Sequence, residues 1–245
     1  MSATQGKGGS AWSHRHPWLL MTLAPLLLVQ ALHTRRVTPR LPEPAGERVG
    51  RTGEGRPLRL LITGDSAAAG VGVSSQTQAL SGQLSHRLAA DFTLHWQLEA
   101  TTGHTASDAI ARLQHLPVQP FDVAVVSLGV NDVTAGIGAQ HWVTRLRELS
   151  TLLAERFQVR QVIFSPVPPM HLFPALPQPL RGYLGSRARH FNEALARQVG
   201  DMPGATLLQV DLTGLTTASD GFHPGPEAYA AWAEALNGCI RAQLV

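Results

Sequence analysis

Three short segments of the chain carry side chains suited to nucleophilic chemistry, and a fourth, around Gly103, can expose a backbone N–H donor. Ser66 stands in the segment Gly64-Asp65-Ser66, directly after an apolar, strand-like run. His223 follows Asp220 by three residues, so the carboxylate can hold one ring nitrogen of the imidazole and leave the other free to act as a base. Asn131 supplies an uncharged N–H donor that could stabilise a developing oxyanion. Together these residue types predict attack by a serine hydroxyl on a carbonyl group.

Other functions of the Ser66 segment fit the sequence less well. A phosphate-binding loop needs a lysine, and the single lysine of the chain, Lys7, lies far upstream. The glycines after the first strand-like run do not match the dinucleotide fingerprint. Ala68 stands where the nucleophile elbow of α/β-hydrolases needs glycine. Taken alone, Ser66 could cap a helix and Asn131 could form a turn, so the argument depends on their combination.

Strand-like runs alternate with segments of helical period. The expected strands are 58–63, 92–100, 121–129, 161–167 and 206–212. Apolar residues recur at helical spacing around Leu80–Leu88, Trp142–Leu153, Leu184–Val199 and Tyr229–Ile240, with Pro226 suited to the first turn of the last helix. This alternation predicts an α/β domain whose five-stranded, mostly parallel sheet is covered by helices on both faces. Ligands bind such sheets at the carboxyl ends of the strands, where the four segments lie.

In order and spacing, these segments resemble the four blocks of the SGNH/GDSL hydrolase superfamily. Gly64-Asp65-Ser66 is similar to its first block, Gly103 to its second, Gly129-Val130-Asn131-Asp132 to its third and Asp220-Gly221-Phe222-His223 to its last. The similarity spans roughly residues 58–241. It implies a flavodoxin-like three-layer α/β/α sandwich, hydrolysis of esters or thioesters, and no metal or organic cofactor.

The resemblance also implies a role for each matching residue. Ser66 would attack the acyl carbonyl, His223 would take its proton and pass it to the leaving group, and Asp220 would orient His223. The oxyanion would be held by the N–H groups of Ser66 and Gly103 and by the Asn131 side chain. The neighbouring Asp65 and Asp132 are expected to hold loops by hydrogen bonds to the backbone.

Charge is distributed unevenly along the chain. Residues 1–56 hold eight basic and three acidic side chains, a net charge of +5, whereas the remainder holds twelve arginines and fourteen acids, a net charge of −2. The predicted domain therefore lacks the basic footprint of a nucleic-acid-binding protein. Cys239 is the only cysteine, so no intrachain disulfide can form.

The first 57 residues are expected to lie outside the catalytic domain, which we assign to 58–245. A basic region (1–17) precedes an apolar segment (18–32), whose fifteen residues fall short of the roughly 20 that cross a bilayer but suit a signal-peptide core. The following residues 33–57 have the composition of a flexible linker. Arg35, Arg36 and Arg40 oppose translocation. The segment predicts a membrane-associated protein or one exported to the periplasm or beyond. Four alternatives stay open: a cleaved signal, a retained anchor, attachment at the cytoplasmic face and a buried N-terminal helix.

The segment 165–185 is apolar where loops are usually polar, and it leaves the fourth predicted strand on the same rim as the site. We expect Met170, Phe173 and Leu176 to line an acyl groove or lid, with a rigid packed loop as the alternative. The expected partner is a small-molecule ester or acyl substrate. Several substrate classes fit, because the superfamily that the sequence resembles also holds lysophospholipases, thioesterases, carbohydrate deacetylases and acyltransferases. A non-catalytic envelope binding module is a further alternative.

Overall fold

Six strands form one sheet in the order β1-β3-β2-β4-β5-β6. The computed structural model describes residues 17–211, 214 and 216–244. Five strands are mutually parallel, and β1 pairs antiparallel with β3 at one edge. The strands are β1 (Val49–Thr52), β2 (Arg56–Gly64), β3 (Phe92–Ala100), β4 (Val123–Ser127), β5 (Gln161–Phe164) and β6 (Ala205–Leu207). Without β1, the order of the parallel strands is that of a flavodoxin-like sheet.

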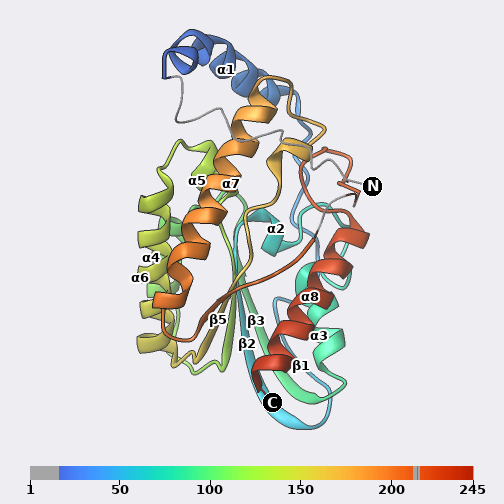
Figure 1. Cartoon of the computed structure of the whole chain (residues 1–245). Helices are drawn as coiled ribbons and strands as arrows, with labels where there is room; N and C mark the ends of the chain where they lie inside the picture. The colour runs from blue at the N-terminus through green and yellow to red at the C-terminus, as the bar shows by residue number, and fades with distance from the viewer. Residues whose placement is uncertain (1–16, 212–213, 215, 245) are drawn as a thin grey trace, which may run out of the picture.

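Helices cover both faces of this sheet, which gives three layers (Figure 1). One face carries α4 (Ala106–Gln114), α5 (Val130–Thr134), α6 (Ala139–Phe157) and α7 (Leu180–Gln198). The other carries α2 (Ser66–Ala69), α3 (Leu80–Leu88) and α8 (Pro226–Leu244). A separate apolar core lies on each face, and every residue of β4 is buried because both of its sides face a core. The predicted three-layer α/β/α sandwich is confirmed.

Several elements differ from the sequence expectation. The strand expected over 206–212 is confined to β6, and residue 212 lies outside the described residues. Helix α4 was not expected, although Thr105 and Asp108 form a capping box at its start, a signal that is visible in the sequence. Two short 3₁₀ helices, η1 (Met170–Leu172) and η2 (Val199–Asp201), lie on either side of α7.

Part of the predicted linker belongs to the sheet. Val49–Thr52 forms β1 and pairs with residues 94–97 of β3, which makes the sheet six-stranded instead of five-stranded. The linker prediction over 33–57 is wrong for this stretch because a strand at the polar edge of a sheet needs no apolar run. Its backbone pairs with β3, while its side chains are exposed or half-buried.

The predicted apolar segment forms most of α1 (Pro17–Val37), so the helix extends five residues into the predicted linker. This helix lies against α7 at the end of the molecule that also holds α2 and α5 (Figure 1). No helix in the described part of the chain combines the length and apolarity that crossing a membrane requires. Whether the segment is a signal or an anchor stays a prediction.

Candidate active site

Ser66 is placed by the junction between β2 and α2. Strand β2 lies between β3 and β4, so this junction is the point where the strand order changes direction, the usual ligand site of such sheets. The N-cap of α2 is Asp65, whose carboxylate accepts a hydrogen bond from the backbone N–H of Ala67 at 3.0 Å. Ser66 is thus the first helical residue, and its N–H has no acceptor among the described residues.

Asp220 and His223 lie in one tight loop before α8. Asp220 Oδ1 accepts hydrogen bonds from the backbone N–H groups of Phe222 and His223, each at 3.0 Å, and Oδ2 lies 2.5 Å from His223 Nδ1. Burial opposes ionisation of this carboxyl, but the hydrogen bonds from His223 and from the backbone outweigh it and lower the pKa of Asp220. The loop therefore holds a buried carboxylate directly against one side of the imidazole.

The other side of the imidazole faces Ser66. His223 Nε2 lies 2.8 Å from Ser66 Oγ, although the two residues are 157 positions apart in the chain. The sequence-predicted Ser66, His223 and Asp220 therefore form one continuous hydrogen-bonded chain. A hydroxyl, an imidazole and a carboxylate in this order can pass the hydroxyl proton to the ring as the oxygen attacks an electrophile.

Asn131 and Gly103 reach the same place from two other loops. Asn131 lies in the first turn of α5, where its Nδ2 donates to the carbonyl oxygen of His104 at 3.0 Å and lies 3.5 Å from Asp65 Oδ2. Gly103 has φ +89° with open space where a side chain would be, so backbone conformation and not crowding calls for glycine. Both residues line the pocket that contains Ser66.

Two buried carboxyls support these loops. Asp132 accepts the backbone N–H of Ala106 with both oxygens at 3.2 Å and so fastens the start of α4 to α5. Burial raises the pKa of Asp132, and burial together with the nearby charge of Asp132 raises the pKa of Asp65 to about 7. The expectation that Asp65 and Asp132 hold loops through the backbone is confirmed by these bonds.

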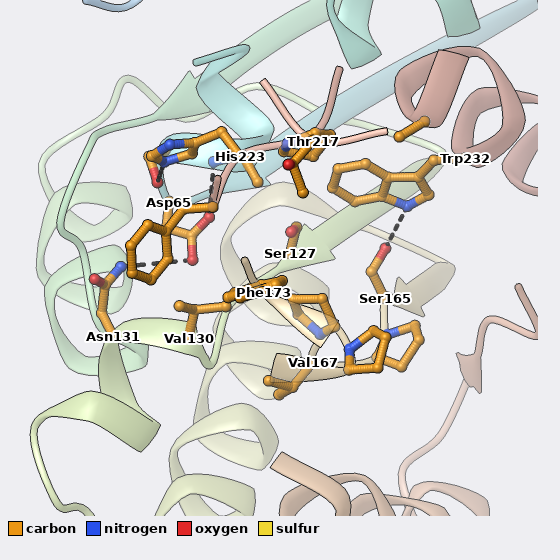
Figure 2. A pocket seen from close by; sticks show the side chains of 18 of the residues that line it. Asp65, Ser127, Val130, Asn131, Ser165, Val167, Phe173, Thr217, His223 and Trp232 are labelled. Carbon is orange, nitrogen blue, oxygen red and sulfur yellow. Dashed lines mark hydrogen bonds between the residues drawn. The ribbon is translucent and has the colours of Figure 1, made fainter. Parts of the chain in front are cut away.

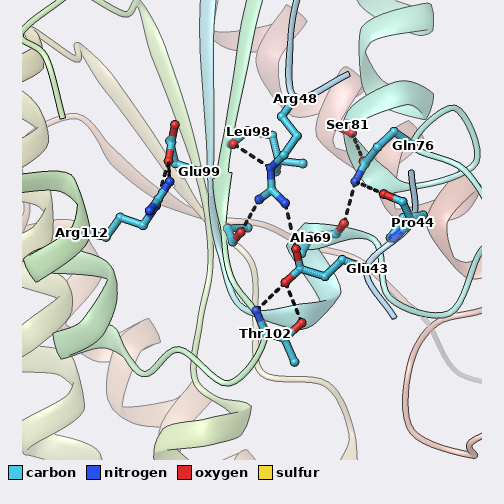
Figure 3. Close-up of polar contacts among 11 residues, drawn as sticks. Glu43, Pro44, Arg48, Ala69, Gln76, Ser81, Leu98, Glu99, Thr102 and Arg112 are labelled. Carbon is cyan, nitrogen blue, oxygen red and sulfur yellow. Dashed lines mark hydrogen bonds and ion pairs between the residues drawn. The ribbon is translucent and has the colours of Figure 1, made fainter. Parts of the chain in front are cut away.

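The Gly103 loop is also held from the region predicted to be a linker (Figure 3). Glu43 Oε1 accepts from the backbone N–H and the hydroxyl of Thr102, each at 2.8 Å, and Oε2 lies 2.9 Å from Arg48 Nη1. Arg48 in turn donates to the carbonyl oxygens of Leu98 and Ala100 near the end of β3. Although partial burial opposes it, bonding to Thr102 and Arg48 lowers the pKa of Glu43. Sequence reasoning missed this contact because nothing local marks it.

A pocket of about 610 Å³ opens beside Ser66 and is mostly apolar (Figure 2). The loop after β5 supplies part of its wall through Pro166–Pro169, Leu172 and Phe173, so Phe173 lies where the sequence predicts. For Met170 and Leu176 the prediction is wrong: both are buried in the core on the α7 side and do not line the pocket. The turn of η1 packs Met170 inward and leaves Leu172 at the surface.

The pocket is also lined by residues to which the sequence analysis gives no role in the site. Trp232, expected only as a core residue of the last helix, lines the pocket and donates its indole N–H to Ser165 Oγ at 3.0 Å (Figure 2). Phe222 meets the Phe173 ring edge-on, with 5.6 Å between the ring centroids. Val130 adds an apolar side chain from α5. Among the described residues, no group of three or more His, Cys, Asp or Glu side chains could hold a metal ion.

A flavodoxin-like α/β/α sheet with a serine, histidine and aspartate chain at its carboxyl edge defines the class as an SGNH-type hydrolase fold. Comparison with known families agrees: residues 62–231 match the GDSL-like lipase/acylhydrolase family. The chain belongs to this family. Membership makes the protein an ester-hydrolysing enzyme.

Individual relatives support the same assignment. A GDSL-like esterase of Mycobacterium tuberculosis is 30% identical over an alignment that covers 88% of this chain and 76% of the relative. Among solved structures, a carbohydrate esterase family 2 enzyme of Corynascus thermopiles aligns with a TM-score of 0.63 at 15% identity, over 79% of this chain and 68% of that one. A carbohydrate acetylesterase from Sinorhizobium meliloti aligns with a TM-score of 0.57 at 17% identity, over 76% and 99%. These two structures share the fold.

Proposed function

We propose that the protein hydrolyses carboxylic esters or thioesters through a covalent acyl-enzyme on Ser66. The observation that carries this proposal is the hydrogen-bonded chain from Ser66 Oγ through His223 to Asp220. As Ser66 Oγ bonds to the acyl carbon, its proton moves to His223 Nε2, and Asp220 stabilises the imidazolium. His223 then gives that proton to the departing alcohol or thiol. Water then attacks the acyl carbon while His223 takes a proton from it. His223 passes this proton to Ser66 Oγ as the bond to the acyl group breaks, which releases the carboxylic acid and free Ser66.

Three donors would stabilise the negative charge that develops on the carbonyl oxygen: the N–H groups of Ser66 and Gly103 and the side-chain amide of Asn131. The Ser66 and Gly103 N–H groups have no acceptor among the described residues, which leaves them free for this oxygen. The 3.5 Å contact between Asn131 and Asp65 is long, so an oxyanion could replace Asp65 as acceptor at little cost. Fixed donors of this kind usually account for a large part of the rate enhancement of an enzyme that hydrolyses esters.

The pocket supports an acyl substrate longer than acetyl. Its volume of about 610 Å³ is far more than a two-carbon group fills, and Val130, Val167, Leu172 and Phe173 present apolar surface in the same pocket as Ser66. An alkyl chain buried there would gain about 0.8 kcal/mol for each methylene removed from water. The resulting substrate class is an ester or thioester with an extended acyl group.

Hydrolysis of a series of 4-nitrophenyl esters tests both parts of this proposal. We expect kcat/KM to rise from acetate to longer acyl chains, and Ser66→Ala to abolish turnover of every ester while leaving the unfolding curve intact. A preference for acetate would instead favour deacetylation of a carbohydrate, the activity named for the Sinorhizobium meliloti neighbour. Equal background rates for the wild type and Ser66→Ala would favour a binding module.

A further inference from the structure

Helix α1 keeps an apolar surface in contact with solvent. Nine large apolar side chains are exposed among the described residues, and six of them lie in this helix: Met21, Leu26, Leu28, Val29, Leu32 and Val37. Scattered exposed apolar residues are ordinary, but their concentration in one element marks an interaction surface. A seventh, Leu172, lies on the wall of the pocket.

The helix is seated on the domain by a defined inner face. Leu23, Leu27, Gln30 and Thr34 recur at helical spacing, and between residues 21 and 37 they are the residues that are buried or half-buried. Leu27 packs against the core on the α7 side. Gln30 Nε2 donates to the carbonyl oxygen of Gln178 at 2.7 Å, while its Oε1 accepts from the N–H of Leu180 at 3.1 Å. Four of the six exposed apolar residues, Met21, Leu28, Val29 and Leu32, therefore lie on the outer side of a docked helix.

This outer side is a continuous apolar stripe. At 100° per residue, Met21, Pro25, Leu28, Val29 and Leu32 fall opposite the inner face, and all five are exposed. We call them the outer stripe. Its C-terminal end carries exposed Arg35 and Arg36, and exposed Arg40 follows shortly after. No acidic residue occurs between positions 17 and 42. The surface thus combines apolar side chains with uncompensated positive charge.

From this combination we infer that α1 lies in the headgroup layer of an anionic membrane, with the outer stripe against the acyl chains and the three arginines on lipid phosphates. Apolar side chains on one face beside basic residues are typical of helices that lie in the membrane interface. Anionic headgroups supply the charge complementary to Arg35, Arg36 and Arg40, which a neutral apolar partner would not. The inner face is already occupied by the domain, so the helix is held parallel to the protein surface.

Membrane contact at α1 would bring lipid close to the pocket. Gln30 binds the segment around Gln178, which is the continuation of the loop whose Pro166–Phe173 part lines the pocket. Leu172 is exposed on that loop and lines the pocket. This consequence rests on the proposed function: the enzyme would take lipid-like esters directly from the membrane surface.

Sedimentation of the purified full chain with vesicles tests the inference. Vesicles of phosphatidylcholine with phosphatidylglycerol are compared with vesicles of phosphatidylcholine alone. The double variant Leu28→Glu/Leu32→Glu should bind the anionic vesicles about tenfold or more weakly than the wild type, because it places charge in the acyl region. Arg35→Gln/Arg36→Gln should bind roughly tenfold more weakly to anionic vesicles and unchanged to neutral ones.

The matched control is Val49→Glu/Val118→Glu. These side chains are 60% and 64% exposed, against 61% and 60% for Leu28 and Leu32, but they lie outside α1. The control should bind vesicles like the wild type. Equal vesicle binding by the Leu28→Glu/Leu32→Glu variant, or no binding by the wild type, overturns the inference. A wild-type dimer that this variant converts to a monomer, without vesicle binding, would show that a second copy covers the stripe.

Two substrates separate this inference from the proposed function. All these variants should hydrolyse a water-soluble 4-nitrophenyl ester at the wild-type rate, since none of the changed residues touches the pocket. Only Leu28→Glu/Leu32→Glu and, to a lesser degree, Arg35→Gln/Arg36→Gln should lose hydrolysis of an ester embedded in anionic vesicles. If the wild type does not hydrolyse the soluble ester, the proposed function is contradicted, whether or not the protein binds vesicles.

Discussion

The two sides of the pocket are built by different forces. On the polar side, Ser66, Asn131 and His223 are held by hydrogen bonds of fixed direction within or between loops. On the apolar side, the side chains of Val167 and Phe173 present only shape and apolar surface to the cavity, although two hydrogen bonds to Asn192 hold the backbone of Val167. Directional bonds place reacting atoms accurately, whereas packing sets only volume and shape. The polar side should therefore control the rate of reaction, and the apolar side should control which acyl group is accepted.

Removing a donor on the polar side gives the largest effect. Asn131→Ala should lower kcat by about 10²–10³ for short and long esters alike, because the amide would act on the oxyanion and not on the acyl chain. Steady-state kinetics on two ester lengths measures this, with a denaturant unfolding curve to show that the variant is folded. A loss below tenfold, or a loss confined to one chain length, would remove Asn131 from the oxyanion site.

Phe173→Ser tests the apolar side. It should lower kcat/KM for long-chain esters by about 10- to 100-fold and leave acetate nearly unchanged, since it removes apolar contact with the chain. The control is Met170→Leu, a change of similar volume at a buried residue that does not line the pocket. If both variants change the chain-length preference equally, the wall assignment of Phe173 is wrong.

Glu43→Ala should weaken the polar side from a distance. Loss of two bonds to Thr102 would loosen the Gly103 loop and lower kcat roughly tenfold, with KM little changed. Glu43→Gln keeps an oxygen that can accept from Thr102 and should recover most of the rate. Glu99→Ala, which removes a carboxylate paired with Arg112, is the matched control (Figure 3). Equal losses in Glu43→Ala and Glu99→Ala would show a general effect on stability.

The smallest effect concerns stability and its dependence on pH. Burial raises the pKa of Asp65 from 3.8 to about 7, so between these values the folded state holds a proton that the unfolded state has lost. The contribution of Asp65 to stability is thus complete below about pH 4 and is lost as pH rises towards 7. Asp65→Asn cannot ionise. Between about pH 4 and pH 7 the free energy of unfolding of this variant should therefore fall less than that of the wild type, by at least about 1 kcal/mol. Denaturant unfolding of both proteins at several pH values measures it. Parallel curves would contradict the assignment.

The sequence predicts the polar side of the pocket much better than the apolar side. Ser66 and Asn131 each follow a strand, His223 precedes a helix, and near neighbours shape two of these turns, through the bonds of Asp65 to Ala67 and of Asp220 to His223. Their place on the carboxyl edge then follows from the α/β alternation. The structure brings them together, with Gly103, as the sequence predicts.

The wall and the outer strand depend on distant contacts and could not be predicted in the same way. Met170, Leu172 and Phe173 are all apolar and nearly adjacent, yet only the turn of η1 decides which of them reaches the cavity. Glu43 and β1 lie in a polar segment whose partners, Thr102 and β3, are about 40 to 60 residues away. A local pattern carries no information about such pairings, because the energy that favours them appears only after the sheet has formed.

Labelling with a fluorophosphonate tests most directly whether Ser66 is the nucleophile that His223 activates. Tryptic digestion after labelling yields a peptide from Leu60 to Arg87 that contains Ser66 and four other serines. The account predicts one phosphonyl adduct on Ser66, formed rapidly in the wild type and hardly at all in His223→Ala. An adduct on another serine, or equal labelling rates in the wild type and His223→Ala, would contradict it.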